Sequence, residues 1–534
     1  MDLPPLSLGL WLLAFSPVAL LLALVLAGVR TARAATAVTV WVIAIGVSAF
    51  RAPPEVVLVG VGKGLWLGTW ILIVIWPALL LYRLASGAGL ERIGAIFATV
   101  LPRRSENLLV VAWIFPSFIQ GVAGFGTPIA VAAPLLLAMG WSRWRAVLYP
   151  LIGYHWAVTF GSMGSSFYMA SLTAHLGPAE QGRFALLAAS MLAVNCLLAG
   201  LLVLLLDGGL AGLREGWRTL LMAGVPMAIT LVVIATIVPA VASLAAGTAG
   251  ILAVALKAAY HKRRASHPVP SLVTAPGVGD GDPISPSADG RRATARLLSP
   301  YIYLLVTALP VFLWPTSRAW VGRVGRLAPS FPGTETGRGW QNAPVTDFTP
   351  LSPLGHPGFY ILLACALGYV TYRRSGLWAP GRTRQVVGQW VRSLPKASVS
   401  VLLLACVATL LVEAGLISIL ARGIAAATGA AYPAIAPLVG AMGSFVTGST
   451  TSSNALFAAL QRDVAILIDV PPHVLLAAQT VGGNIGNALA PVVVLIGATS
   501  VDAADQTGAI LRACLLPAAV LFGAAMLWTL LAVG

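Results

Sequence analysis

The apolar positions along this chain follow the pattern of a protein that crosses a membrane many times. Apolar runs recur from one end to the other, and short segments rich in Arg, Gly or Pro separate them. A helix needs about 20 apolar residues to span a bilayer, so the runs allow about 12 helices plus some broken or re-entrant segments. We therefore predict an all-α polytopic membrane protein. The runs lie at residues 7–29, 35–51, 56–82, 107–140, 146–170, 183–206, 219–240, 241–257, 298–315, 358–373, 395–420, 430–446, 447–468, 473–498 and 507–533.

One apolar run contains a stretch, QGVAGFGTPIAVAAPLLLAM at 120–139, in which a helix cannot simply continue. Its closely spaced glycines weaken a helix interior, and Pro128 lacks a backbone donor and clashes with the preceding turn. In hydrocarbon, a broken backbone is tolerated only where protein or a water-filled cavity satisfies the freed groups. Interrupted segments at membrane depth indicate the substrate site of a transporter, so we expect Gly124, Gly126 and Thr127 to line one.

A second segment, TGSTTSSN at 447–454, is dense in hydroxyl and amide groups although apolar residues flank it. Its hydroxyls and the free amides of an unwound turn can bind a carboxylate, and the N-terminus of the following helix favours negative charge. Ser453 or Asn454 would make a suitable N-cap for that helix. Alternatively, the hydroxyls bond back to the helix or permit close packing. We favour a ligand site, formed by Thr447, Gly448, Ser449, Thr451, Ser452, Ser453 and Asn454.

Two further segments carry the same combination of glycine and polar residues. In QTVGGNIGN at 479–487, the paired glycines and the following Ala-Pro predict an irregular turn, and GSMGSS at 161–166 offers a counterpart in the first half. For each, close helix packing is the alternative to a ligand site. Corresponding breaks in the two halves indicate two structural repeats around a site at the membrane midplane. The residues expected opposite the hydroxyl-rich turn are Gln479, Gly482, Gly483 and Asn484.

Ionisable side chains inside apolar runs are costly and are candidates for function. Glu413 could carry a coupled proton or pair with a cation, or it could lie near the membrane edge and end its helix. His155 could relay protons because its unperturbed pKa is about 6.5, although a buried structural histidine is the commoner outcome. Lys63 could bind an anion or extend to the membrane interface, and we favour the latter.

Composition supports the membrane assignment, because 58% of the 534 residues are hydrophobic and 9% are charged, against about 25% charged in soluble domains. The net charge of +16 would suggest nucleic-acid binding in a soluble protein. Here the Arg and Lys cluster in a few connecting segments, which fits positive-inside topology with the N-terminus outside and no nucleic-acid partner. The four cysteines stand singly, so we expect no disulfide framework, metal site or cofactor.

Two polar stretches organise the chain. Residues 261–297 are rich in Pro, Gly, Ser and Arg, and predict a flexible cytoplasmic loop between an N-terminal membrane half, 1–260, and a C-terminal half, 298–534. Residues 316–357 should lie outside, as a plain connector rather than a lid. The sequence contains no G-x-S-x-G, H-E-x-x-H or Walker A motif. It therefore predicts a secondary transporter rather than an enzyme or an ATP-driven pump.

At its two breaks the chain resembles the lactate permease family of bacterial secondary transporters. AGFGTPIAVAAPLL and the later FGSMG are similar to one signature of that family, GSFVTGSTTSSNALFAALQ to a second, and the Gly-Gly pair at 482–483 to a third. The order and spacing extend over most of the chain. The resemblance implies import of L-lactate, D-lactate or glycolate by proton symport through the bacterial inner (plasma) membrane. The family's wider relationships imply hairpin segments from two repeats and an elevator-type movement.

The chain departs from this family where charges are expected. Gln120 stands where the family commonly has Glu, Thr450 where it has Asp, and Asn487 where it has Lys. Residues 154–157, Tyr-His-Trp-Ala, replace Asn-Thr-Ala-Pro, and Glu413 stands at a usually uncharged position. The transporter class survives these changes, but they alter the path available to a proton and reshape the pocket.

We therefore predict a secondary active transporter for a small organic anion, most simply a 2-hydroxymonocarboxylate such as L-lactate, with protons as the coupling ion. The lipid bilayer is its other partner, and the sequence leaves the oligomeric state open. Backbone amides and hydroxyls would hold the carboxylate, and Glu413 or His155 would carry protons. The alternatives are a permease for another carboxylate or sulfonate with different ion coupling and, ranked lower, an anion channel.

Overall fold

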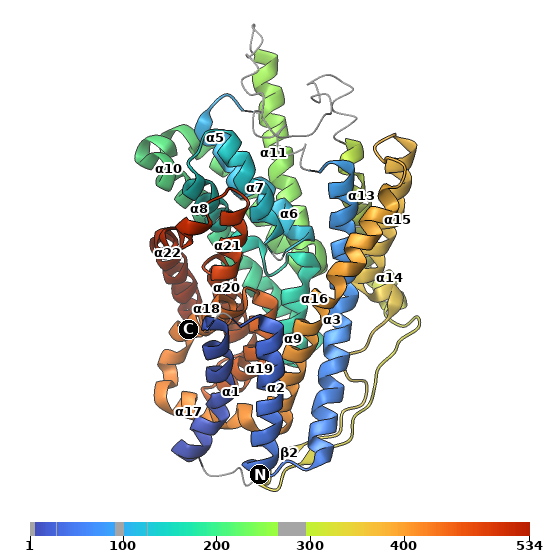
Figure 1. The fold of residues 1–534 in the computed structure, drawn as a ribbon, viewed down its shortest axis with the longest axis vertical. Helices are drawn as coiled ribbons and strands as arrows, with labels where there is room; N and C mark the ends of the chain where they lie inside the picture. The colour runs from blue at the N-terminus through green and yellow to red at the C-terminus, as the bar shows by residue number, and fades with distance from the viewer. Residues whose placement is uncertain (1–5, 28, 91–100, 125, 265–294) are drawn as a thin grey trace.

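The structure is almost entirely helical (Figure 1). The computed structural model describes residues 6–27, 29–90, 101–124, 126–264 and 295–534. Before the central loop the helices are α1 (Leu8–Leu26), α2 (Thr31–Ser48), α3 (Pro54–Ala88), α5 (Arg104–Leu109), α6 (Phe115–Val122), α7 (Thr127–Ala138), α8 (Arg143–Tyr154), α9 (Ser165–Thr173), α10 (Pro178–Ile237) and α11 (Ala242–Arg264). After it they are α13 (Ser299–Leu313), α14 (Pro315–Val321), α15 (Pro357–Arg374), α16 (Arg382–Glu413), α17 (Leu416–Thr428), α18 (Tyr432–Thr447), α19 (Thr450–Leu467), α20 (Pro472–Ala488), α21 (Pro491–Thr499) and α22 (Thr507–Val533).

Short elements of other types connect these helices. The strands β1 (Thr334–Glu335) and β2 (Gln341–Asn342) form one small antiparallel pair. A π-helical turn, η1 (Val110–Ile114), joins α5 to α6. The 3-10 turns are η2 (His155–Ala157), η3 (Ser162–Gly164), η4 (Pro239–Val241), η5 (Pro353–Gly355), η6 (Gly429–Ala431) and η7 (Ala504–Gln506).

The number of long apolar helices confirms a multi-pass α-helical membrane protein. Among the described residues, 10 helices are long and apolar enough to cross a membrane, or up to 11 if the bent pair α13 and α14 is one span. The 60-residue α10 is a helical hairpin, because Gly209 (φ 54°) breaks it. Gly200 on one arm lies against Leu220 on the other, and Gly224 lies against Leu197. Counting both arms adds one further crossing.

The helices α3 and α16 pack against each other, although they belong to opposite halves of the chain. Gly60, Gly64 and Gly68 occur at every fourth position on one face of α3, and an added Cβ at each would collide with α16. Small residues at this spacing let helix backbones approach closely in a membrane. The two halves therefore share a long, close interface. Of the predicted loop at 261–297, residues 265–294 lie outside the described part of the chain.

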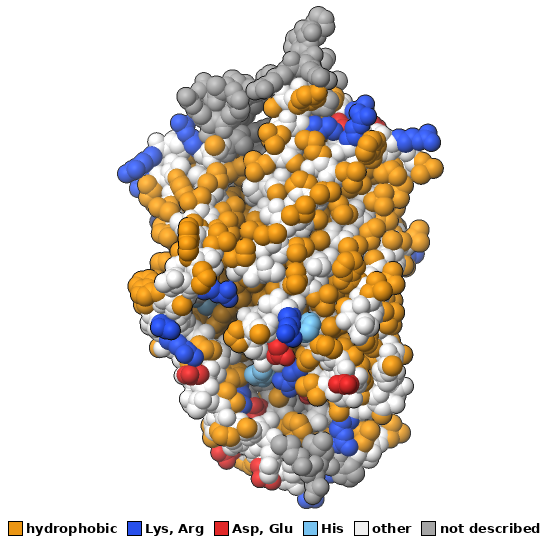
Figure 2. Space-filling view, turned by 180° about the vertical axis from the view of Figure 1, so that it is seen from behind, with side chains coloured by type: hydrophobic (Ala, Val, Ile, Leu, Met, Phe, Trp, Pro, Cys, Tyr) orange, Lys and Arg blue, Asp and Glu red, His pale blue; other side chains and the backbone are white. Residues whose placement is uncertain are grey.

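Basic side chains lie at one end of the molecule, where α3 ends and α16 begins, and a second group of basic side chains lies in the other half of the face shown in Figure 2, beside acidic ones. The N-terminus lies at the opposite end (Figure 1). Acidic side chains are more common at that end on the face shown in Figure 2. The positive-inside rule applied to this arrangement gives an N-terminus outside the cell, which stays a prediction.

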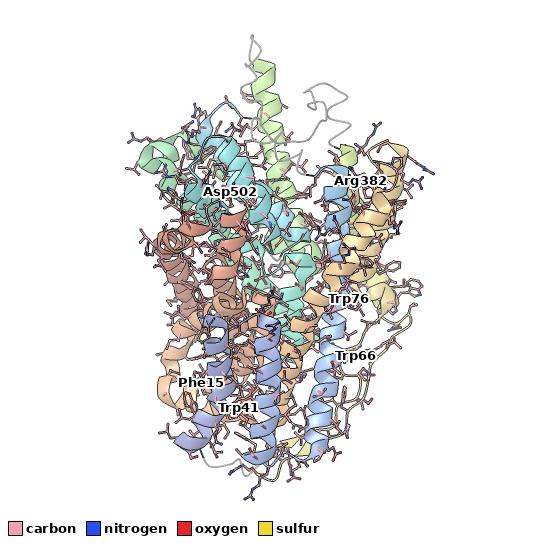
Figure 3. The ribbon with its side chains drawn as sticks, in the orientation of Figure 1. Phe15, Trp41, Trp66, Trp76, Arg382 and Asp502 are labelled. Atoms are coloured by element: carbon pink, nitrogen blue, oxygen red, sulfur yellow. The ribbon has the colours of Figure 1, made fainter. Side chains whose placement is uncertain are left out.

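The polar stretch 316–357 is packed against α3. After α14 it follows the outside of α3 as an extended segment that contains the β1–β2 pair (Figure 1). The indole N–H of Trp66, which is labelled in Figure 3, donates to the Thr349 carbonyl at 2.9 Å. The indole N–H of Trp70 donates to the Pro350 carbonyl at 3.2 Å. These bonds fix the stretch on the helix.

Glycine residues also allow α18 and α20 to pack closely against each other. An added Cβ at Gly440, Gly482 or Gly486 would lie 1.8–2.3 Å from a carbonyl oxygen of the facing helix. The prediction of an irregular turn at Gly482 and Gly483 is wrong, because α20 runs unbroken from Pro472 to Ala488. The chain instead breaks at Leu489 and Ala490, between α20 and α21. Close packing explains Gly482, whereas Gly483 faces a different surface.

We expect Gly482→Ala to lower the thermal-unfolding midpoint of the purified protein in detergent. The new methyl group would lie 1.8 Å from the Pro437 carbonyl oxygen, and overpacking of this kind costs about 1–3 kcal/mol or more. The control is Gly388→Ala on α16, where an added Cβ has no atom within 4 Å. Alanine there should be neutral or stabilising by about 1 kcal/mol. Equal midpoints for the two variants would contradict the packing.

Candidate functional site

The first predicted break is confirmed. The helix α6 ends at Val122 and α7 begins at Thr127, and Gly126 between them adopts a left-handed conformation at φ 81°. An added Cβ at Gly124 would lie 2.3 Å from the Ser162 hydroxyl oxygen. The break therefore lies directly against a hydroxyl group from the next irregular segment.

That next segment is a strained left-handed turn. Ser162, Met163 and Gly164 have φ values of 46°, 56° and 72°. For non-glycine residues, this conformation costs about 1–2 kcal/mol each. Such strain persists only where the surrounding structure enforces it, and it concentrates at functional sites. The turn confirms the irregular segment predicted in the first half, and it places Ser165 and Ser166 in the first turn of α9.

The break in the second half separates α18 from α19, and Gly448 at φ 68° turns the chain there. Ser449 is the N-cap of α19, since its hydroxyl accepts the backbone N–H of Ser452 at 3.3 Å. The prediction that Ser453 or Asn454 caps this helix is wrong, because the helix begins directly after Ser449. Both of those side chains are instead fully buried in the protein.

The short helix α21 covers both glycine turns. An added Cβ at Gly126 would lie 2.7 Å from Ile496, and one at Gly448 would lie 2.3 Å from Val492. Val492 and Ile496 are four residues apart, so they lie on one face of α21. The breaks predicted in opposite halves of the chain are thus brought to the same helix.

A buried network of hydroxyl and amide groups connects α9, α19 and α20. The Thr451 hydroxyl bonds with those of Ser165 and Ser166 at 3.3 and 2.8 Å. The Asn454 amide donates to the Ser166 carbonyl at 2.9 Å and to the Thr480 hydroxyl at 3.0 Å. Residues from both halves of the chain therefore share one set of hydrogen bonds.

The network continues toward the turn before α9. The Thr159 hydroxyl bonds with the Thr480 hydroxyl at 2.9 Å and donates to the side-chain oxygen of Asn484 at 2.9 Å. On the other side, the Gln479 amide donates to the Ser453 hydroxyl at 3.1 Å. Every partner named here is uncharged. A ligand in this region would meet neutral donors and acceptors.

Three buried polar atoms beside the second break have no hydrogen-bond partner among the described residues: the hydroxyls of Ser444 and Thr450 and the side-chain oxygen of Asn454. An added Cβ at Gly483 would lie 2.9 Å from the Thr450 methyl carbon and 3.0 Å from the Ser444 hydroxyl. The Ser444 hydroxyl and the Thr450 methyl group therefore both lie against the backbone of Gly483. Buried polar atoms are nearly always paired, so these three atoms can each take a further hydrogen-bond partner.

The three positions where the family resemblance predicts charges also lie at the breaks. Gln120 is buried against Gly161, on the left-handed turn. Asn487 donates its amide to the Gly448 carbonyl at 2.9 Å, which satisfies the backbone of the second break. Thr450 begins α19. The side chains at these three positions, at the edges of the network, are therefore uncharged as well.

Glu413 lies elsewhere, at the end of α16, and no hydrogen bond between described residues joins it to the network. It forms a buried ion pair with Lys63 of α3 at 2.5 Å, and Thr334 donates to its second carboxylate oxygen at 2.9 Å. The Lys63 ammonium also lies 5.8 Å from the ring centroids of Phe331 and Phe348. Of the alternatives left open for Glu413, pairing with a cation and a place at the end of its helix are both confirmed. The preference for Lys63 at the membrane interface is wrong, because this pair holds its ammonium inside.

His155 lies beside the network, in the turn η2, and is fully buried. Its Nδ1 bonds with the Ile152 carbonyl at 2.8 Å, which requires the proton on Nδ1. Its Nε2 has no partner among the described residues. The adjacent Trp156 carbonyl accepts the Asn484 amide at 3.4 Å. A free imidazole lone pair thus lies one residue from the network.

The sequence analysis missed Thr159 and Gln461. Thr159 is a single hydroxyl in an apolar segment, a pattern more typical of a side chain that bonds its own helix. Gln461 donates to the side-chain oxygen of Gln479 at 2.9 Å. Its spacing from Asn454, two helical turns, was the available signal that both lie on one face of α19.

Comparisons with known proteins find similar sequences over most of the length of this chain. A family model described as L-lactate permease matches residues 11–332 and 337–534. The L-lactate permease of Salmonella typhi is 26% identical over 502 residues, which cover 90% of this chain and 87% of that protein. A glycolate permease of Escherichia coli (strain K12) is 26% identical over 473 residues, with coverage of 84% and 82%. The L-lactate permease of Bacillus subtilis (strain 168) is 23% identical over 496 residues, with coverage of 88% and 86%.

Solved structures show more distant similarity. The YdaH transporter of Alcanivorax borkumensis has a TM-score of 0.45 at 14% identity, covering 86% of this chain and 84% of that chain. MtrF of Neisseria gonorrhoeae has a TM-score of 0.43 at 14% identity, with coverage of 86% and 80%. Because the family model extends over nearly all of the sequence, this protein belongs to the L-lactate permease family.

Proposed function

We propose that this protein is a secondary active transporter that imports L-lactate or a related 2-hydroxymonocarboxylate, such as D-lactate or glycolate, across the bacterial plasma membrane by proton symport. Its relatives include L-lactate permeases and a glycolate permease. The observation that carries the proposal is the buried network of neutral polar groups at two helix breaks that α21 brings together. Broken helices at membrane depth are the typical place of a transporter's substrate site.

The unpaired atoms at the second break match the groups of a 2-hydroxy acid. The N-terminus of α19 carries the positive end of the helix dipole, which favours a carboxylate. The hydroxyls of Ser444 and Thr450 donate to that carboxylate, and the free side-chain oxygen of Asn454 accepts from the 2-hydroxyl. Gly483, which has no side chain, lies beside the Ser444 hydroxyl and the Thr450 methyl group. The other proposed contacts come from Ser449, Thr451 and Ser452.

His155 is the better placed of the two proposed proton carriers. Its Nε2 is buried without a partner among the described residues, and the next residue, Trp156, accepts the Asn484 amide at its backbone carbonyl. Glu413 is already neutralised by Lys63 and bonded to Thr334. A proton on that carboxylate would leave the Lys63 ammonium buried without its counter-charge, which is costly.

A different coupling ion or carboxylate is the second candidate. The positions of Gln120, Thr450 and Asn487 are uncharged here although the family commonly has two carboxylates and a lysine there. The hydrogen bonds of the network are all between neutral groups. A substrate such as another carboxylate or a sulfonate, with a different ion in symport, fits the same donors.

Proteoliposomes that contain the purified protein should accumulate labelled L-lactate when an inward proton gradient is imposed. Accumulation should disappear when a protonophore collapses the gradient, while exchange of internal for external L-lactate continues. An L-lactate flux that does not depend on the proton gradient would contradict proton symport. Accumulation driven by sodium instead of protons would favour the second candidate.

Thr450→Val should weaken substrate binding without weakening the fold. A hydrogen bond to a charged group contributes about 1.5 kcal/mol or more, so KM for L-lactate should rise about tenfold. The unfolding midpoint should not fall, because the Thr450 hydroxyl has no protein partner to lose. The control is Thr529→Val, whose buried hydroxyl bonds to the Ala525 carbonyl of its own helix. An unchanged KM in Thr450→Val would remove this residue from the site.

His155→Gln should abolish proton-driven accumulation of L-lactate and leave exchange intact. Gln can still hydrogen-bond, but it cannot take up a proton at physiological pH. Both fluxes are measured in the same proteoliposomes, so loss of folded protein would lower the two together. Full accumulation by the variant would exclude His155 as the carrier.

The Lys63–Glu413 pair should prove structural. Glu413→Gln alone leaves a buried ammonium unpaired and should lower the free energy of unfolding by about 3–5 kcal/mol. The double variant Lys63→Met/Glu413→Leu removes both charges and should recover most of that loss and retain proton-driven accumulation. A stable double variant that exchanges L-lactate but no longer accumulates it would instead make Glu413 the proton carrier.

A further inference from the structure

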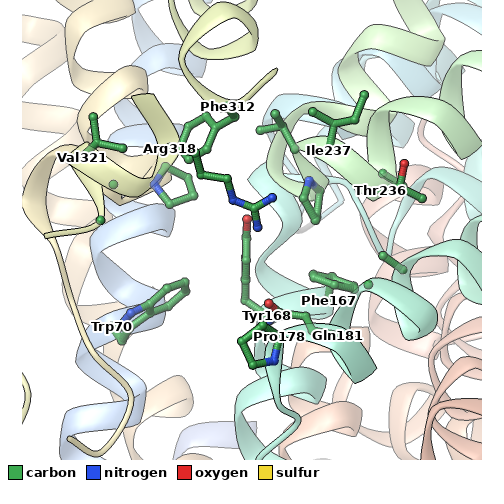
Figure 4. Close-up of a pocket in the computed structure, with 18 residues that line it drawn as sticks. Trp70, Phe167, Tyr168, Pro178, Gln181, Thr236, Ile237, Phe312, Arg318 and Val321 are labelled. Atoms are coloured by element: carbon green, nitrogen blue, oxygen red, sulfur yellow. The ribbon is translucent and has the colours of Figure 1, made fainter. Parts of the chain in front are cut away.

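A cavity of about 310 Å³ lies between α3, α9, α10 and α14 (Figure 4). Its volume is at the lower end of the range of about 300–1,000 Å³ that is typical of small-molecule sites. Four aromatic side chains contribute to its walls, those of Trp70, Phe167, Tyr168 and Phe312. The cavity can therefore hold a small molecule that has an apolar part.

The guanidinium of Arg318 points into this cavity, toward the hydroxyl of Tyr168 (Figure 4). None of the salt bridges between described residues involves Arg318, and no Asp or Glu is among the described residues that line the cavity. A guanidinium presents parallel N–H groups that match a carboxylate. Gln181 and Thr236 add uncharged polar groups to the lining. The cavity thus combines one cation with aromatic walls.

The walls are held in place by contacts with one another and with residues beyond the cavity. The Trp70 ring lies 5.1 Å from the Tyr168 ring and 4.4 Å from the His356 ring, between centroids. Its indole N–H donates to the Pro350 carbonyl at 3.2 Å. The extended stretch after α14 therefore fixes one wall before a ligand arrives, which lowers the entropic cost of binding.

The cavity and the buried polar network share the helix α9. Ser166 bonds to Thr451 on the network side, and Tyr168 lines the cavity. Residues two apart point to nearly opposite faces of an α-helix. A ligand in the cavity would thus be separated from the network by the thickness of one short helix.

We propose that this cavity is a second binding site for a small monocarboxylate, distinct from the site at the helix breaks. The carboxylate pairs with the Arg318 guanidinium, and the alkyl or aryl part of the ligand lies between Trp70, Phe167 and Phe312. A single cation with aromatic walls suits a monoanion with an apolar part better than it suits phosphate, whose oxygens are polar on every side. The choice of L-lactate as ligand rests on the proposed transport function. The site itself rests on the cavity alone.

Labelling of arginine with phenylglyoxal, followed by peptide mass mapping, tests the site without any transport. L-lactate or benzoate added to the full-length protein in detergent should slow labelling of Arg318 severalfold. Arg323 lies in the same exposed stretch outside the cavity, and its labelling rate should not change. Unchanged labelling of Arg318, or equal protection of both arginines, would overturn the proposal. Equal protection by inorganic phosphate at matched ionic strength would overturn the assignment to monocarboxylates.

Uptake kinetics test whether the site serves transport. Arg318→Gln should raise KM for L-lactate about tenfold and leave the maximal rate unchanged, because the lost contact holds the substrate before translocation. Arg318→Lys should restore part of the affinity, and Arg323→Gln should match the unaltered protein. An unchanged KM in Arg318→Gln would overturn a role for the site in uptake. If L-lactate is not carried at all, the protection of Arg318 by benzoate still decides whether the cavity binds carboxylates, so the two failures are distinguishable.

Discussion

Every backbone polar group within hydrocarbon needs a partner, and this requirement decides where the broken segments of the protein can lie. The glycine turns at Gly126 and Gly448 both pack against α21. The second turn is satisfied by its own side chains and by Asn487, whose amide bonds to the Gly448 carbonyl. The interruptions therefore meet other parts of the protein, which supply partners for the backbone that the breaks leave free.

The same constraint acts on charge. A lone ionised group inside a membrane protein is costly, and the Lys63–Glu413 pair meets that cost with a direct ion pair and the Thr334 hydroxyl. The network at the breaks avoids the cost by using uncharged side chains throughout. The ion pair thus holds α3, α16 and the extended stretch together, whereas the network at the breaks is made of neutral groups.

Much of this architecture was accessible from the sequence. The apolar runs gave the helices because hydropathy depends on local composition, and the break at 123–126 was predictable because glycine and proline act on their own backbone. The paired glycines of α20 led to the wrong prediction of a turn, because that prediction also considered only the effect of glycine on its own backbone. Local rules favour a turn at Gly482, whereas the approach of α18 makes glycine necessary inside a continuous helix. Arg318 carried no local signal, since it stands in a short exposed helix.

The sequence by itself determined that the chain is a multi-pass α-helical membrane protein with interrupted segments in both halves, because apolar length and helix-breaking residues are properties of the segment that contains them. Only the tertiary structure decided which polar groups meet. It joined Thr451 to Ser166, paired Glu413 with Lys63, and left the hydroxyls of Ser444 and Thr450 without a partner in the part of the chain that the structure describes. Hydrogen bonds and ion pairs act over a few ångströms in space, so they depend on how distant helices pack and not on spacing along the chain.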